Sequence, residues 1–274
     1  LREAHRLDET RGGHHRGYIS PGAIVKNLKL LSSSNRGYKF RPGRQEDAHE
    51  FLVHLLDAMN DGELRAAGID QNQSGWRDRL PFPRLDETTF VHRIFGGYLR
   101  SQVRCTRCNY KSNTYDPFLD LALEVSKKDS VERAFRDFTR TETLDVNNQW
   151  KCSGCKKRVC AKKQLTVFRP PLSLVIQLKR FTFGSGGMLG GIMPFGRGSG
   201  FGYGHFAGKG MGMKGRGGSK ITKCIAFPKV LNLPLSDERL CVYELSGVVI
   251  HVGGSATSGH YTAYVRKPQG DGSY

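Results

Sequence analysis

Residues 45–59 of this 274-residue sequence form an amphipathic pattern and read QEDAHEFLVHLLDAM. The apolar residues recur at intervals of three and four: Ala48, Phe51, Leu52, Leu55, Leu56 and Met59. This spacing places them on one face of an α-helix with 3.6 residues per turn. Acidic side chains in a first helical turn favour the positive end of the helix dipole, which suits the opening Gln45-Glu46-Asp47. We therefore predict a helix over residues 45–59.

The segments on either side predict a second helix and a loop. Upstream, Ser20 can cap a helix that has Pro21 at its first position and places Ile24, Leu28 and Leu31 on one face. Downstream, residues 60–87 are polar and interrupted by Gly and Pro, which is typical of a connecting loop.

The rest of the chain favours strands with one short helix among them. Ser130 can cap a helix whose inner face is Val131, Ala134, Phe135 and Phe138. Strand-forming residues are concentrated at 88–91, 118–125, 164–168, 172–183, 226–233, 242–252 and 260–265. Helices followed by mainly antiparallel strands predict an α+β fold.

Residues 184–218 interrupt this pattern, because glycine occupies nearly every second position there. Such a composition does not bury a core, so we predict a low-complexity insertion between two strands. Its Arg and aromatic residues leave open a second interpretation, in which the segment binds single-stranded RNA.

The composition restricts the class of protein. The formal charge of +18 and the pI of about 9.8 predict attraction to acidic partners without choosing among them. No apolar run approaches the roughly 20 residues of a membrane helix, so no membrane partner is predicted.

Four of the seven cysteines form two C-x-x-C pairs, Cys105 with Cys108 and Cys152 with Cys155. Two such pairs make a tetrahedral four-thiolate set that suits one structural zinc ion, and they indicate a reducing compartment. The alternative is four free or redox-active cysteines. The other three, Cys160, Cys224 and Cys241, lack metal-ligand spacing and are expected to pack as small apolar residues.

A histidine near the C-terminus has the placement of a general base. Residues 243–265 predict a strand, a Gly/Ser loop and a second strand that begins at His260. A histidine at the rim of a sheet can reach both a nucleophile and a substrate. Taken alone, such a residue is more often structural.

Together these motifs resemble the ubiquitin-specific proteases, a family of cysteine deubiquitinases. The order of the motifs carries the resemblance: Gln45-Glu-Asp-Ala-His-Glu-Phe51, the two C-x-x-C pairs, Leu178-Lys-Arg-Phe181 and Gly259-His260-Tyr261. The resemblance implies an α+β, papain-like right-hand fold. Its expected parts are a helical thumb (1–87), zinc-ribbon fingers (88–168) and a β-rich palm (169–274), with the insertion at 184–218.

The resemblance also implies a reaction and a set of site residues. The expected substrate is ubiquitin, cleaved after its C-terminal glycine, and His260 maps onto the catalytic base. Gln45, Glu46, Asp47, Gly259 and Tyr261 map onto positions that line the ubiquitin tail. The four paired cysteines map onto the zinc ligands at the fingertip.

Two parts of the family pattern have no counterpart in the sequence. The box that carries the nucleophilic cysteine is expected upstream of Gln45, and the residue that orients the histidine is expected after Tyr274. We therefore expect the chain to be part of a longer enzyme and to be inactive alone; the alternative is a pseudoenzyme that binds ubiquitin without cleaving it. Segments before Gln45 and before Leu178 are most similar to a nuclear and nucleolar subgroup, which implies a nuclear location, with the cytoplasm as the alternative.

Overall fold

The computed structural model of the chain describes residues 21–31, 40, 45–71, 73, 75–81, 84–182, 219–255 and 258–266. The chain divides into two compact units, Leu1–Arg44 and Gln45–Tyr274. The predicted insertion at 184–218 lies outside the described residues. Within them, no helix has the length and hydropathy needed to cross a bilayer.

The described part of the first unit, residues 21–31 and 40, includes two short helices, α2 (Gly22–Lys26) and α3 (Leu28–Leu31). They occupy the predicted helical segment, but Pro21 precedes α2 as its N-cap instead of taking the first helical position. Asn27 separates the two helices and donates from its side-chain amide to the carbonyl of Ala23.

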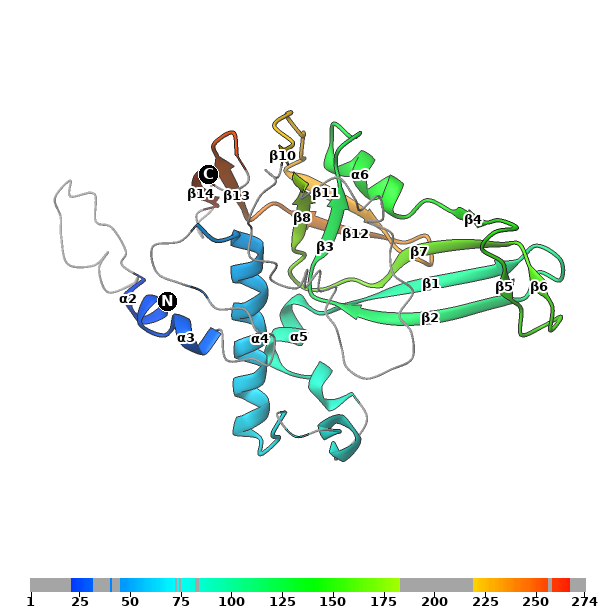
Figure 1. The fold of residues 1–274 in the computed structure, drawn as a ribbon, viewed down its shortest axis with the longest axis horizontal. Helices are drawn as coiled ribbons and strands as arrows, with labels where there is room; N and C mark the ends of the chain where they lie inside the picture. Colours follow the sequence, from blue (N-terminus) through cyan, green and yellow to red (C-terminus); the bar gives the residue numbers. More distant parts are fainter. Residues whose placement is uncertain are drawn as a thin grey trace. The chain divides into compact units, whose positions relative to one another are not determined.

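The second unit begins with α4 (Ala48–Ala66), which confirms the amphipathic helix and corrects both of its ends (Figure 1). Gln45 and Glu46 are not helical, and Asp47 is the N-cap. The carboxylate of Asp47 accepts from the N–H of His49 and of Glu50, which satisfies two donors that have no partner inside the helix.

The predicted loop and strand after α4 contain helical turns instead. Two short 3₁₀ helices, η1 (Trp76–Arg79) and η2 (Leu85–Glu87), lie within the predicted loop. The predicted strand at residues 88–91 is wrong, because α5 (Phe90–Phe95) forms there. The Thr89 side chain caps α5 by accepting from the N–H of His92, so β propensity is overridden by capping.

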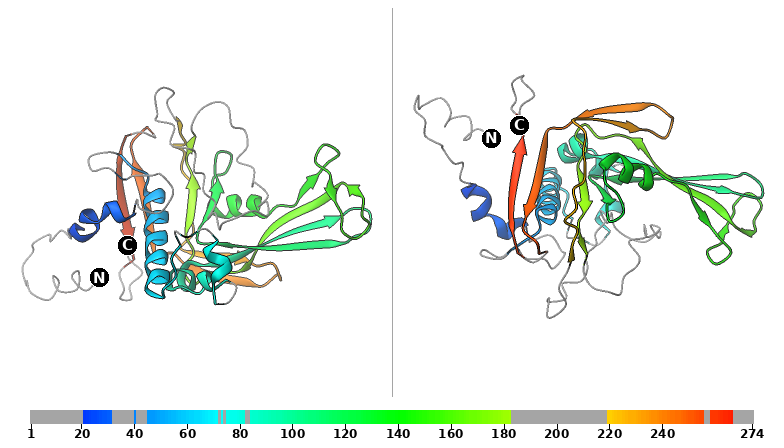
Figure 2. Two further views of the ribbon diagram at one scale, coloured as in Figure 1. Left: turned by 60° about the horizontal axis from the view of Figure 1, so that its bottom comes forward. Right: turned by 90° about the horizontal axis from the view of Figure 1, so that it is seen from above.

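A long antiparallel sheet follows, with the strand order β2-β1-β7-β4 (Figures 1 and 2). Its strands are β1 (Gly97–Cys105), β2 (Lys111–Phe118), β4 (Glu142–Leu144) and β7 (Ala161–Arg169). The small strands β5 (Trp150–Lys151) and β6 (Arg158–Val159) pair with each other near its far end. We call this end the cysteine tip, because all four paired cysteines lie there.

The other described strands pair two by two. β3 (Leu121–Glu124) and β8 (Ile176–Lys179) are parallel, whereas the other pairs are antiparallel. Those pairs are β9 (Phe181–Thr182) with β10 (Ser219–Lys220), β11 (Val230–Pro234) with β12 (Leu240–Glu244), and β13 (Gly247–Val252) with β14 (His260–Val265). Each of the predicted strands at 118–125, 172–183 and 242–252 is therefore split between two elements.

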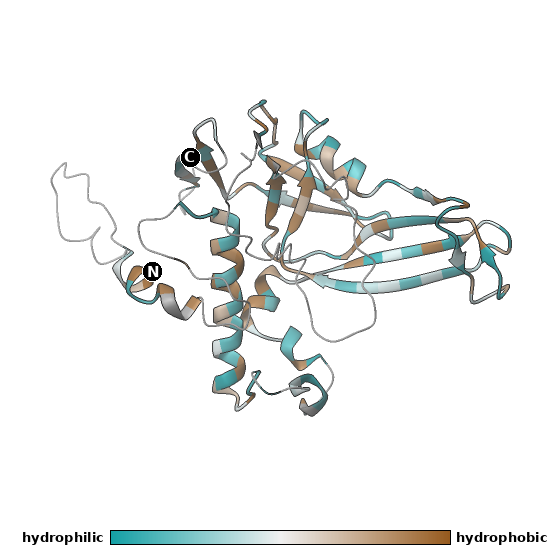
Figure 3. Ribbon diagram, viewed as in Figure 1, coloured by the Kyte–Doolittle hydropathy of each residue, from teal (hydrophilic) through white to brown (hydrophobic). Residues whose placement is uncertain are grey.

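The main core lies where β3, β8 and β11 meet the helix α6 (Val131–Phe138). Ser130 caps α6 as predicted, and Val131, Ala134 and Phe135 are buried. The other buried members of this core are Phe118, Leu121, Leu123, Val125, Val167, Ile225, Leu233 and Leu235. Figure 3 colours much of β3 and β8 as hydrophobic, in agreement with their position in this core.

The assignment of this core can be tested by comparing an alanine substitution at Leu123 with the same substitution at an exposed leucine, Leu172. The side chain of Leu123 is 0% exposed and that of Leu172 is 80% exposed. We expect Leu123→Ala to lower the free energy of unfolding by about 2–5 kcal/mol, through lost apolar burial and the cavity left behind. Leu172→Ala should change it by less than about 0.5 kcal/mol. Urea denaturation measures both, and equal losses would contradict the assignment of the core.

Candidate functional site

The β13–β14 hairpin presents the predicted catalytic histidine. The two strands are antiparallel, with Val252 opposite His260 and His251 opposite Tyr261. His260 is the first residue of β14 and is exposed, as the predicted strand, loop and strand required. Its role as a catalytic base stays a prediction.

His251 is a neighbour of this loop that the sequence analysis missed. Its ring packs against the rings of Tyr261 and Phe181, with centroids 4.8 and 5.4 Å away, and its Nδ1 atom is buried. Burial lowers the pKa of His251, and the positive charge of Lys220 lowers it further, against the opposing effect of Asp47. The neutral ring is therefore favoured. No local pattern in the sequence indicates this role, because it depends on the strand register that places His251 opposite Tyr261.

The His251 ring leaves no room for a side chain at Gly259, the residue before His260. A Cβ atom built on Gly259 would lie 2.2 Å from Nε2 of His251 and 2.5 Å from the carbonyl oxygen of Val252. Real Cβ atoms essentially never approach other atoms this closely. The backbone that leads into His260 is therefore packed against the imidazole of His251.

Lys220 ties the start of the same loop to a neighbouring strand pair. Its Nζ, from β10, donates to the carbonyl oxygens of His251 and Gly253, at 2.8 and 2.5 Å. Gly253 has φ of +134°, a conformation that side-chain-bearing residues rarely adopt. The strand end and the loop are thus held by a cation that comes from a distant part of the sequence.

Asp47 connects α4 to the histidine hairpin. While Oδ1 caps the helix, Oδ2 lies 3.5 Å from the hydroxyl of Tyr261, at the outer limit of a hydrogen bond. Burial and the charge of Asp47 both raise the pKa of Tyr261, which keeps its hydroxyl protonated. The structure therefore brings together Asp47, Tyr261 and the start of β14.

The other predicted tail-binding residues flank this contact. Gln45 and Glu46 directly precede the Asp47 cap, with Gln45 exposed and Glu46 half-buried. Further along α4, His49 pairs with Asp120 at 2.9 Å. Burial acts to lower the pKa of His49, but the hydrogen bond and charge of Asp120 outweigh it, so the pKa is raised. This pair attaches the first turn of α4 to the segment that leads into β3.

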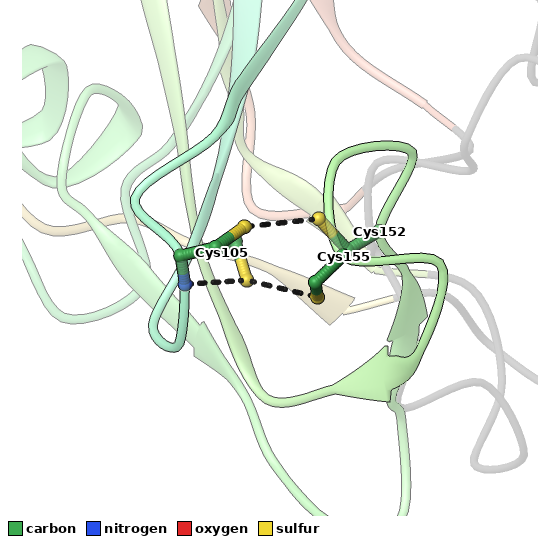
Figure 4. A group of neighbouring side chains, drawn as sticks. Cys105, Cys152 and Cys155 are labelled. Atoms are coloured by element: carbon green, nitrogen blue, oxygen red, sulfur yellow. Dashed lines mark hydrogen bonds between the residues drawn. The ribbon is translucent and has the colours of Figure 1, made fainter.

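The two C-x-x-C pairs come together at the cysteine tip (Figure 4). The four sulfur atoms lie within 4.8 Å of one another, with 4.0 Å between those of Cys105 and Cys155 and 3.6 Å between those of Cys108 and Cys152. A tetrahedral zinc ion with Zn–S bonds of about 2.3 Å requires S···S distances of about 3.8 Å. The donor set and its spacing fit one such ion.

The backbone around the cysteines supports this arrangement. The N–H groups of Arg107 and Cys108 both donate to the sulfur of Cys105, at 3.4 Å. Donation from the Cys108 N–H acts chiefly to lower the pKa of Cys105, against the effect of burial, and favours its thiolate form. Burial and the neighbouring thiols raise the pKa of Cys108 instead, so within the cluster Cys105 is the favoured thiolate. Asn109 and Lys156, each directly after the second cysteine of a pair, have positive φ and turn the chain tightly.

The sequence and the fold were compared with known proteins. The model of the ubiquitin carboxyl-terminal hydrolase family matches residues 4–273. The chain belongs to the ubiquitin carboxyl-terminal hydrolase family. This confirms the resemblance to the ubiquitin-specific proteases and their α+β fold.

Several relatives in this hydrolase family match over most of the chain. A probable ubiquitin carboxyl-terminal hydrolase 16 of Schizosaccharomyces pombe is 37% identical, over 95% of this chain and 47% of its own length. Ubiquitin carboxyl-terminal hydrolase 23 of Arabidopsis thaliana is 35% identical, over 92% of this chain and 24% of its own length. Human ubiquitin carboxyl-terminal hydrolase 42 is 34% identical, over 92% of this chain and 16% of its own length. The chain thus spans less than half the length of each of these relatives.

Solved structures of the hydrolase family have the same fold. One is a SAGA Ubp8/Sgf11/Sus1/Sgf73 DUB module bound to ubiquitin aldehyde, with a TM-score of 0.58 and 26% identity over 83% of this chain and 43% of that one. A related Ubp8 module bound to monoubiquitin has a TM-score of 0.56 and 26% identity over 82% of this chain and 41% of that one.

Proposed function

We propose that the chain is part of a thiol-dependent deubiquitinase that cleaves the bond after the C-terminal glycine of ubiquitin. The observation that carries the proposal is the family match over residues 4–273. Two similar solved structures hold ubiquitin aldehyde and monoubiquitin, which supports ubiquitin as the substrate of this chain as well.

In this mechanism His260 is the general base. It removes the proton from a cysteine thiol, the thiolate attacks the carbonyl carbon of the last ubiquitin glycine, and the imidazolium then protonates the departing amine. Water hydrolyses the resulting thioester and regenerates the thiol. The exposure of His260 at the start of β14 supports this role, because the base must reach both sulfur and substrate.

The nucleophile is proposed to come from outside the 274 residues. Four cysteines are clustered at the cysteine tip, Cys241 lies in β12, and neither Cys160 nor Cys224 begins a helix. None of the latter three therefore has the helix N-terminus that can depress the pKa of a reactive thiol.

A ubiquitin probe with a thiol-reactive C-terminal group tests the proposal. The chain as given and a version extended at both ends from its native transcript are both incubated with it. We expect only the extended version to be labelled, His260→Ala to abolish labelling, and Cys224→Ala, at an exposed cysteine, to leave it unchanged. If neither version is labelled yet both bind unmodified ubiquitin, the pseudoenzyme alternative replaces the enzyme.

Asp47 is proposed to line the ubiquitin tail as well as to cap α4, and two variants separate these roles. Asp47→Ala removes both cap and charge and should lower the free energy of unfolding by about 1 kcal/mol. Asp47→Asn keeps a good N-cap and removes only the charge. We expect both variants to bind ubiquitin more weakly but only Asp47→Ala to unfold at lower urea. Unchanged ubiquitin affinity in Asp47→Asn would contradict the binding role.

The four-cysteine cluster is proposed to hold one zinc ion, supported by its sulfur spacing. All four positions are protein ligands, so a bound ion would stabilise the fold of the tip instead of taking part in the reaction. A nuclear location is proposed from the charge of +18 and from the similarity of the segments before Gln45 and Leu178 to a nuclear and nucleolar subgroup. Imaging of the tagged full-length protein tests it.

A further inference from the structure

The cysteine tip carries a dense group of positive charges. Its exposed basic residues, which we call the tip cations, are Arg104, Arg107, Lys111, Lys151, Lys156, Lys157, Arg158 and Lys162. Seven of them lie within three residues of a clustered cysteine along the chain, and the four sulfur atoms lie within 4.8 Å of one another. The cations therefore occupy one small region of the surface.

The strand register places several tip cations directly opposite one another. Arg104 faces Lys111 across β1 and β2, and it faces Lys162 across β1 and β7. Residues directly opposite in a sheet point to the same face, so three cations form a row across adjacent strands about 4.8 Å apart. Lys151 and Arg158 face each other in the same way in β5 and β6. Like charges in these positions destabilise a sheet, which an anionic partner would relieve.

Acidic groups in the described part of the chain leave most of this charge uncompensated. Among the residues that the structure describes, no ion pair with a tip cation is found. Glu142 in β4 pairs instead with Lys163 at 3.4 Å. Four thiolates with one divalent metal ion would carry about two negative charges, and Asp145 adds one. Eight cations face these three negative charges.

Aromatic rings lie among the tip cations. Tyr110, next to Lys111, is 42% exposed, and its ring stacks nearly parallel to that of Trp150, next to Lys151, with centroids 6.4 Å apart. Exposed aromatic rings surrounded by cations suit single-stranded nucleic acid, whose phosphates are neutralised while its bases stack. An acidic protein surface could pair with the cations, but it carries no run of bases to stack on the ring.

We propose that the cysteine tip binds single-stranded nucleic acid, with the tip cations contacting phosphates and the exposed part of Tyr110 contacting a base. This surface includes neither the hairpin that carries His260 nor any of residues 184–218. It adds a binding function to the proposed hydrolase and does not depend on cleavage of ubiquitin.

The test titrates a fluorescent single-stranded oligonucleotide of about 12 nucleotides, within the size range of one binding site. The chain lacking residues 184–218 is used alongside the intact chain, so that the Gly/Arg-rich segment is not responsible for the signal. The tip variant is Arg104→Gln/Lys111→Gln/Lys162→Gln. Its matched control, which removes the same charge from exposed positions elsewhere, is Arg65→Gln/Lys127→Gln/Arg136→Gln.

We expect the tip variant to bind about 10- to 100-fold more weakly near 0.1 M salt, and the slope of log K against log salt to become shallower by about 2. The control should lose less than about 3-fold, since it changes only the overall charge. The melting temperature of the tip variant should stay the same or rise, because like-charge repulsion is removed. If the triple variant loses its fold, Lys162→Gln alone should reduce the slope by about 0.7.

Three results would overturn the proposal. Equal losses of oligonucleotide affinity in the tip variant and the control would show that only the net charge of the chain matters. No binding by the chain that lacks residues 184–218 would assign any affinity to that segment. Tip-dependent binding of anionic vesicles or an acidic peptide, without binding of the oligonucleotide, would replace nucleic acid with another partner.

Discussion

Replacing Cys105 with alanine is expected to abolish zinc binding at the cysteine tip, the site that we propose for one zinc ion, and to unfold the tip locally. Cys105 and Cys152 are both 0% exposed, so their sulfur atoms have no water to compensate for a lost ligand. Structural zinc contributes about 10–16 kcal/mol to the folding of small zinc-finger peptides near neutral pH. In this larger domain the loss falls on the ends of β1 and β2, β5 and β6, which have little other core than Val159 and Trp150.

The measurements are the zinc content of the purified chain and hydrogen exchange at the tip. We expect the zinc content to fall from about one ion per chain to almost none. Loss of a direct ligand should weaken zinc binding more than the roughly 10- to 100-fold loss of affinity that follows mutation of residues that only contact the ligands. Amides of β1 close to Cys105 should lose protection, while those of β3 should keep theirs. Cys224→Ala is the control, because Cys224 is exposed and lies outside the cluster. An unchanged zinc content in Cys105→Ala would refute the four-cysteine site.

Gly259→Ala is expected to displace the loop of the β13–β14 hairpin and to slow the reaction, although the side chain of His260 is unchanged. The added methyl group would lie 2.2 Å from the His251 ring and 2.5 Å from the backbone oxygen of Val252, so the loop must move. Overpacking of this kind typically costs about 1–3 kcal/mol of stability. Because a displacement of about 1 Å can reduce a catalytic rate about 100-fold, we expect that loss in the labelling rate of the extended chain.

Gly254 provides the matched control in the same loop. A Cβ atom built on Gly254 would have no other atom within 4 Å, so Gly254→Ala should leave the labelling rate within about two-fold. The labelling rate and the urea midpoint are measured for both variants. Similar rates for Gly259→Ala and Gly254→Ala would show that the packing against His251 does not position His260.

Helix α4 shows that the periodicity of apolar residues predicts a helix but not where the helix begins and ends. The apolar spacing from Ala48 to Met59 identified the helix, but the helix continues to Ala66. Gly62 suggested a loop, whereas Leu64 is buried and extends the apolar face by two turns beyond Leu56. Its start was misplaced because an Asp can favour either a first turn or an N-cap, and only the hydrogen bonds from Asp47 distinguish them.

Helix α5 shows tertiary contacts overriding local preference. The residues Thr88, Phe90 and Val91 favour strands in isolation. In the fold, Thr89 caps a helix, and Val91 and Phe95 pack with Leu56 of α4. The burial of Val91 against a segment over 30 residues away outweighs a propensity difference of about 1 kcal/mol or less.

Some features of the candidate sites could be predicted from the sequence, and others depend on the tertiary structure. Residue types and spacing in the sequence identified the four cysteines, the loop before His260 and the family, because each depends on short segments and on the order of motifs. Three other features depend on contacts between segments that are distant in the sequence. The two cysteine pairs meet although 43 residues separate them, Asp47 lies close to Tyr261, and the ring of His251 packs against Gly259. Such contacts are set by strand register and packing, which no local pattern encodes, so only the tertiary structure decided them.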